Sequence, residues 1–127
     1  MSLEIIVNER ERGTFNISLR GSIDSQNCPL LEEKISQVLD KAPNVVIFDL
    51  DDVTYITSMG LSLMVKTEKE IKQRGKTLIV VNIPDQVKKV FDVIAALPAM
   101  NIFKSIEEAD EYLIKIQRDQ IDKNQKL

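Results

Sequence analysis

Residues 45–61 read VVIFDLDDVTYITSMGL, and this stretch decides how the fold is interpreted. Its first residues form a continuous apolar run rather than an alternating one. Such a run favours a strand that is covered on both faces, at the centre of a mixed sheet. We therefore predict a strand over 45–50, an acidic loop over Asp51 to Ser58, and a helix from Ser58 to Arg74.

Two shorter apolar runs precede this stretch, at Leu3 to Val7 and Phe15 to Leu19. The second run alternates with polar residues, as in a half-buried strand, so the pair predicts a hairpin or two neighbouring strands. Gly21 then breaks the pattern. Pro29 suits the first turn of a helix, because its missing N–H would have no partner there. Apolar residues follow at helical spacing, at Leu31, Ile35, Val38 and Leu39.

The alternation of helix and strand continues towards the carboxyl end. Thr77 to Asn82 predicts a buried strand, Pro84 opens a third helix, and Ile102-Phe103 predicts a short edge strand. The apolar stripe of the third helix consists of Val87, Val90, Phe91 and Ile94. A final helix is predicted from a second stripe, Ala109, Tyr112, Leu113 and Ile116. This order predicts an α/β domain over residues 1–118, with a mixed central sheet of about four to five strands and about four helices. A polar tail over 119–127 is expected to fray.

The composition argues against several classes of function. The net charge is −3 and aromatic residues make up 5% of the chain. The sequence therefore offers neither a basic stripe for phosphates nor aromatic side chains on which bases could stack, and nucleic acid is not an expected partner. The chain has no His and one cysteine, Cys28, which argues against a Ser-His triad, a disulfide and a cysteine-based zinc site. No signal-like core or apolar run of roughly 18 residues is present. We expect a cytoplasmic protein that is not an enzyme, with no cofactor and no membrane partner.

The hydroxyl groups at the start of the second helix are the first candidates for a site. Thr57 or Ser58 serves either as an N-cap, its oxygen accepting a backbone N–H, or as a group available to a partner. Met59 and Leu63, four residues apart, fall opposite the main apolar stripe of that helix. We expect this pair to be exposed, either as a docking surface or as ordinary scattered apolar residues.

The acidic residues also have two interpretations. Asp24, in the loop after the second strand, either contacts a partner or caps its own loop through an Asx-type bond. Asp49, Asp51 and Asp52 are of the type that binds hard cations, but solvated acidic turns are far commoner, so we expect no metal. Position 70 is Glu, so no glycine precedes Gly75-Lys76 at phosphate-loop spacing and a Walker-type nucleotide site is excluded.

Three segments together resemble a known family. Asp49-Leu50 followed by Ile56-Thr57-Ser58-Met59-Gly60-Leu61 resembles the signature of STAS domains, the fold of anti-sigma-factor antagonists. Gly21-Ser22-Ile23-Asp24 resembles the family's loop after the second strand, and Ile83-Pro84 through Phe91 resembles its strand exit and helix. The likeness runs in order and spacing over about residues 3 to 117.

The resemblance implies a set of site residues. Ser58 corresponds to the phosphoacceptor, with Thr57 as a rival, and Gly60 to the close-packed glycine after it. The implied partner-binding residues are Asp24, Thr57, Met59, Gly60 and Leu63. The chain departs from the family pattern at two positions, since Thr57 replaces the usual Asp and Met59 replaces a second Ser or Thr.

The function implied by the resemblance is that of an anti-sigma-factor antagonist. Its partner would be an anti-sigma factor with a histidine-kinase-like ATPase fold, which binds the unphosphorylated chain and phosphorylates Ser58. A phosphatase acting on phospho-Ser58 would reverse the mark, and the chain itself would be a monomer or weak dimer. The alternatives are a STAS scaffold module without a phosphorylation cycle, and a domain that binds a small ligand at the strand ends.

Overall fold

The computed structural model describes residues 2–94 and 101–103. These residues contain a five-stranded mixed sheet. The elements are β1 (Leu3–Glu11), β2 (Thr14–Ile23), α1 (Cys28–Leu39), β3 (Val45–Ile56), α2 (Ser58–Gln73), β4 (Thr77–Val81), α3 (Asp85–Ile94) and β5 (Asn101–Phe103). The strands lie in the order β1-β2-β3-β4-β5. The β1–β2 pair is antiparallel and the other pairs are parallel. The predicted α/β class, the mixed sheet and the central position of β3 are confirmed.

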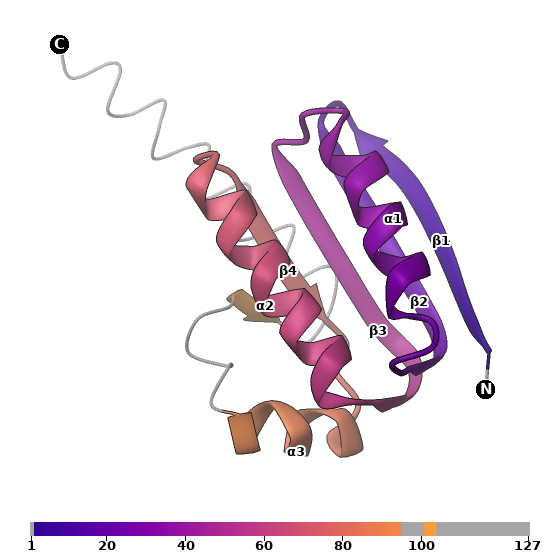
Figure 1. Cartoon of the computed structure of the whole chain (residues 1–127). Coiled ribbons are helices and arrows are strands. Elements are labelled where there is room, and N and C mark those ends of the chain that lie inside the picture. The colour runs from indigo at the N-terminus through magenta and orange to yellow at the C-terminus, as the bar shows by residue number, and fades with distance from the viewer. Residues whose placement is uncertain (1, 95–100, 104–127) are drawn as a thin grey trace, which may run out of the picture.

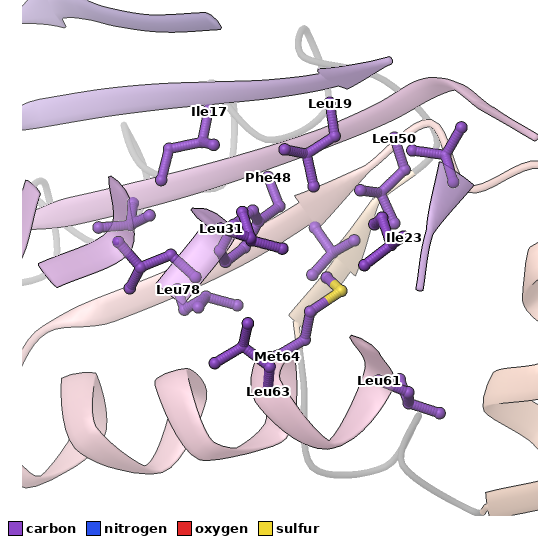
Figure 2. Close-up of a cluster of buried hydrophobic side chains, with 14 of the residues drawn as sticks. Ile17, Leu19, Ile23, Leu31, Phe48, Leu50, Leu61, Leu63, Met64 and Leu78 are labelled. Atoms are coloured by element: carbon purple, nitrogen blue, oxygen red, sulfur yellow. The ribbon is translucent and has the colours of Figure 1, made fainter. Parts of the chain in front are cut away.

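The main core lies between the sheet and the two helices that cover one of its faces. Figure 1 shows α1 and α2 side by side on the same face of the sheet. Ile17 pairs with Phe48 across β2 and β3, and both side chains are completely buried. Leu31 from α1 and Met64 from α2 meet them from the helical side (Figure 2). Each fully buried side chain of this size stabilises the fold by about 1.5–3 kcal/mol.

Strand β3 is longer than the sequence predicted. The predicted loop over Asp51 to Ser58 is wrong, because the strand continues to Ile56 and pairs with β2 over its whole length. Only the half from Val45 to Asp49 also pairs with β4. Two irregularities in the β2–β3 register interrupt the period of two, so polar residues that resemble a turn in the sequence are in fact strand residues.

Strand β2 also continues beyond its predicted end. Gly21 does not break it, and the strand runs on to Ile23. Gly21 has a φ of 106° and lies where β1 begins, and a Cβ at this position would collide with the carbonyl oxygen of Ser2. The next residue, Ser22, donates its N–H to that same oxygen at 3.2 Å. A glycine here therefore lets the two strands approach within a bulge.

The other predicted elements agree with the structure where it describes them. Pro29 lies in the first turn of α1, and α2 ends just before Gly75, whose φ of 71° suits a glycine. The edge strand predicted at 102–103 is confirmed as β5. Of the α3 stripe, Val87 is buried, whereas the side chains of Val90, Phe91 and Ile94 lie outside the described residues. The predicted final helix and the boundary at 118 lie outside them too.

No helix within residues 2–94 is long and apolar enough to cross a lipid bilayer.

Candidate functional site

Main-chain hydrogen bonding brings two junctions of the fold together. One is the loop between β2 and α1, and the other is the point where β3 ends and α2 begins. Ile23 and Ile56 form the last residue pair of the parallel β2–β3 ladder. One residue further, the N–H of Thr57 donates to the carbonyl oxygen of Ile23 at 2.9 Å. Both junctions therefore lie at the same edge of the sheet, where the carboxyl ends of parallel strands commonly form binding sites (Figure 1).

Thr57 is the N-cap of α2. Its backbone is extended, and its Oγ1 accepts a hydrogen bond from the N–H of Gly60 at 3.3 Å. The same hydroxyl donates to the carbonyl oxygen of Ile23 at 3.3 Å. The N-cap interpretation is thus confirmed for Thr57, whose hydroxyl both donates and accepts within the domain.

Asp24 caps the loop in which it lies. Its Oδ1 accepts hydrogen bonds from the N–H groups of Gln26 and Asn27, at 2.9 and 3.1 Å. The Oδ1 of Asn27 in turn accepts a hydrogen bond from the N–H of Asp24 at 2.9 Å. The Nδ2 of Asn27 donates to the carbonyl oxygen of Ser22 at 2.7 Å. The Asx-type interpretation is confirmed, and the sequence did not predict the part played by Asn27.

The start of α2 presents one apolar side chain and buries another. Ser58 is the first residue of the helix, and its side chain lies outside the described residues. Met59 is 53% exposed, as predicted. The exposure predicted for Leu63 is wrong, since it is only 8% exposed. The reason is that α1 packs beside α2, so two neighbours rather than the sheet alone cover the helix, and Figure 2 shows Leu63 next to Met64 on the covered side.

Gly60 is a buried residue in the first turn of α2. A Cβ added there would lie 2.6 Å from Cγ2 of Ile23 and 3.1 Å from Cγ1 of Ile56. The close packing implied for Gly60 is therefore confirmed. This contact joins the helix start to both strand ends at once.

The acidic residues of β3 are held by neighbouring polar groups. Asp49 accepts hydrogen bonds from the N–H of Asp51 and from Nδ2 of Asn82, each at 3.1 Å. Asp52 forms an ion pair with Arg20 at 3.3 Å. Within residues 2–94 and 101–103, no three acidic, His or Cys side chains are grouped as metal ligands would be.

The sequence missed two exposed residues and one pocket near these junctions. Leu30 is 47% exposed in the first turn of α1, and Tyr55 is 52% exposed at the end of β3. A pocket of about 270 Å³ opens between the two helices. Its lining residues are Cys28, Pro29, Glu32, Met59, Ser62, Leu63 and Lys66. Burial raises the pKa of the Cys28 thiol, and the carboxylates of Asp24 and Glu32 add to this effect. The thiol is therefore neutral near pH 7.

Comparison with known proteins places this fold in a family. The model of the STAS domain matches residues 6–109. The "Anti-sigma-B factor antagonist" of Bacillus subtilis is 29% identical over 93 residues, which cover 73% of this chain and 84% of that protein. An anti-sigma factor antagonist from Mycobacterium paratuberculosis has a similar crystal structure, with a TM-score of 0.80, 21% identity, and coverage of 87% of this chain and 93% of that one.

A second similar structure is that of a phosphorylated protein. It is the Bacillus cell fate determinant SpoIIAA in its phosphorylated form, with a TM-score of 0.68 and 22% identity, covering 86% of this chain and 99% of that one. The family model spans most of the chain, and the observed strands and helices lie in the order that the resemblance implies. The chain therefore belongs to the STAS domain family.

Proposed function

We propose that this chain is an anti-sigma-factor antagonist, acting in the cytoplasm, that binds a kinase-type anti-sigma factor and is switched off by phosphorylation of Ser58. The name of the Bacillus subtilis relative supports this class of function. The role is that of a binding protein rather than an enzyme. The chain supplies a surface and an acceptor hydroxyl, while the partner supplies ATP and the catalytic groups.

The observation that carries the proposal is the exposure of apolar side chains around the two joined junctions. Four large apolar side chains are exposed within the described residues, and three of them, Leu30, Tyr55 and Met59, lie next to these junctions. Exposed apolar groups gathered at one edge favour a site of protein contact. We call Asp24, Leu30, Tyr55, Ser58 and Met59 the docking surface.

The hydrogen bonds of Thr57 favour Ser58 as the phosphoacceptor. The Thr57 hydroxyl caps α2 and donates to the carbonyl oxygen of Ile23, so a phosphate there would remove the donated bond and place a bulky charged group at the cap. Ser58 follows it in the first turn of α2. A phosphate on Ser58 would lie near free N–H groups and the positive end of the helix dipole, which both tolerate an anion. Phosphorylation at Ser58 therefore leaves the fold intact.

The switch acts on the partner. Phosphorylation transfers the γ-phosphoryl group of ATP to Oγ of Ser58, which releases ADP and the hydroxyl proton. The product carries about −1.5 to −2 charges. A partner that packs against Ser58 must then desolvate or repel a dianion, and a penalty of about 4 kcal/mol weakens binding roughly a thousandfold. A phosphatase that hydrolyses phospho-Ser58 restores the binding form.

The test combines the purified chain with histidine-kinase-like ATPases from the same genome and with ATP. Phosphate is located by mass spectrometry in the wild-type chain and in the variants Ser58→Ala and Thr57→Ser. Thr57→Ser is the matched control because it keeps the capping hydroxyl. We expect label on Ser58 of the wild type and of Thr57→Ser, and none on Ser58→Ala. If phosphate is found on residue 57 and persists in Ser58→Ala, Thr57 is the phosphoacceptor. If no ATPase phosphorylates the chain, the scaffold alternative is favoured.

A further inference from the structure

The pocket between α1 and α2 is built from two facing helical stripes. Cys28, Pro29 and Glu32 come from α1, and Met59, Ser62, Leu63 and Lys66 come from α2 at the spacing of one helix face. Cys28 and Leu63 are buried at 5% and 8% exposure, whereas Met59 is 53% exposed. The pocket is therefore a shallow depression with an apolar floor, and it is open to solvent.

The size and chemistry of the pocket limit what it can hold. Pockets for drug-sized molecules measure about 300–1,000 Å³, and the volume of about 270 Å³ lies below that range. Its charged groups, Glu32 and Lys66, pair with each other at 3.4 Å. A charged occupant would find no unpaired counter-ion among the lining residues, whereas an apolar occupant would bury surface against the apolar floor. A single uncharged apolar side chain suits the space.

The pocket is continuous with the docking surface. Met59 belongs to the docking surface and also lines the pocket, and it directly follows Ser58 in the chain. A protein that covers the docking surface therefore also covers the mouth of the pocket. Buried pockets that receive one large side chain contribute most of the affinity in many protein interfaces.

We propose that the α1–α2 pocket receives one large, uncharged apolar side chain of the anti-sigma factor, such as Phe, Leu or Met. This proposal rests on the proposed function for the identity of the partner. The pocket fixes the partner through shape and apolar contact, whereas Ser58 switches the complex through charge. Binding and switching are thus carried by adjacent but different side chains.

The first test needs no partner protein. N-acetyl-phenylalanine amide and N-acetyl-lysine amide are titrated into the chain, and the methyl resonances of Met59 and Leu63 are followed by NMR. We expect a saturable shift with the phenylalanine amide and binding at least about tenfold weaker with the lysine amide. Equal responses to both amides, or no saturation, would overturn the proposal. A shift of the same resonances on dilution of the free protein would also overturn it, because a second copy of the chain would then be the occupant.

A set of three variants shows whether the shift comes from the pocket. Ser62 is exposed and lines the pocket, so Ser62→Trp fills it without replacing a core residue, while Ser62→Ala leaves it open. Gln73→Trp places the same indole on exposed helix surface about 16 Å along α2 and controls for surface hydrophobicity. We expect the amide shift to be lost only in Ser62→Trp. A shift that survives in Ser62→Trp overturns the proposal.

The second test uses the anti-sigma factor identified by the phosphorylation assay. We expect Ser62→Trp to weaken the complex by at least about tenfold, with Ser62→Ala and Gln73→Trp close to wild type. If the partner binds Ser62→Trp as well as wild type, the pocket proposal fails and the proposed function stands. If no ATPase binds the chain, the proposed function fails, and with it the identity of the occupant, whereas the amide titration still reports on the pocket.

Discussion

The carbonyl oxygen of Ile23 accepts two hydrogen bonds from Thr57, one from its backbone N–H at 2.9 Å and one from its hydroxyl at 3.3 Å. The same hydroxyl accepts the N–H of Gly60. One residue thus closes the β2–β3 ladder and begins α2. The position of the docking surface depends on this residue.

Thr57→Val keeps the shape of the side chain and removes the hydroxyl. We expect a loss of about 0.5–2 kcal/mol in the free energy of unfolding, because α2 loses its N-cap. Urea denaturation measures this loss. Thr57→Ser retains both hydrogen bonds and should lie close to wild type. Equal stability of Thr57→Val and wild type would show that the hydroxyl does not contribute to stability.

Gly60→Ala tests the close packing under the first turn of α2. Alanine favours a helix over glycine by about 0.5–1 kcal/mol, so an unhindered site would gain stability. We expect instead a net loss of about 1–3 kcal/mol, since the new Cβ would press on Cγ2 of Ile23 at 2.6 Å. The cost should be smaller in an Ile23→Ala background, in which that atom is absent. Purely additive effects in this double-mutant cycle would contradict the contact.

Two substitutions separate the loop-capping role of Asp24 from a role in partner contact. Asp24→Ala removes the acceptor of two N–H bonds and should lower the free energy of unfolding by about 1 kcal/mol. Asp24→Asn keeps an Oδ1 acceptor and removes the charge, so we expect it to fold about as stably as wild type. If Asp24→Asn nevertheless binds the anti-sigma factor more weakly, the charge acts on the partner. Unchanged affinity would assign Asp24 to the loop alone.

An acidic side chain at position 58 should leave the fold stable. The first turn of α2 contains no acidic residue, and a carboxylate near a helix amino terminus stabilises it by about 0.3–1 kcal/mol. We expect Ser58→Asp to unfold at an equal or higher urea concentration than Ser58→Asn, and to bind the anti-sigma factor more weakly. A marked destabilisation of Ser58→Asp would mean that negative charge damages the domain itself.

Cys28 gives a pH dependence of stability with a definite sign. Burial, followed by the charges of Asp24 and Glu32, raises the pKa of this thiol in the folded chain. Above about pH 8.5 the unfolded thiol loses its proton first, so the unfolded state binds fewer protons and stability falls as the pH rises. Cys28→Ala should lose less stability than wild type between pH 8 and 10.5 in urea titrations. If the free energies of unfolding of the two proteins fall in parallel as the pH rises, Cys28 is not the cause of this pH dependence.

The elements that the sequence predicted well are those with unambiguous patterns. The apolar runs at 45–48 and 77–81 became buried strands of the sheet, and Gly75 marked the end of α2 correctly. The extension of β3 was missed because its buried residues Leu50, Val53 and Ile56 recur every three positions. Bulges in the β2–β3 register produce this spacing, and no period of two is left to detect.

The candidate site was predicted in part, for equally specific reasons. Hydroxyls at a helix start and an Asp in a loop are common capping groups, and both roles were anticipated at Thr57 and Asp24. The exposure predicted for Leu63 was wrong because the helical wheel of α2 alone cannot indicate that α1 packs beside it. The spacing of Asn27 three residues after Asp24 is a usable capping signal that was overlooked.

The two junctions at the sheet edge are joined by a main-chain hydrogen bond from residue 57 to Ile23, and every amino acid except proline can supply that N–H. Related copies in one genome can therefore change the side chains at 24, 58 and 59 while the spacing between the junctions stays constant. Duplicated copies could acquire separate partners by changing their surfaces alone. The strand ladder that ends at Ile23 and Ile56 thus allows parallel signalling pathways to diverge without a new fold.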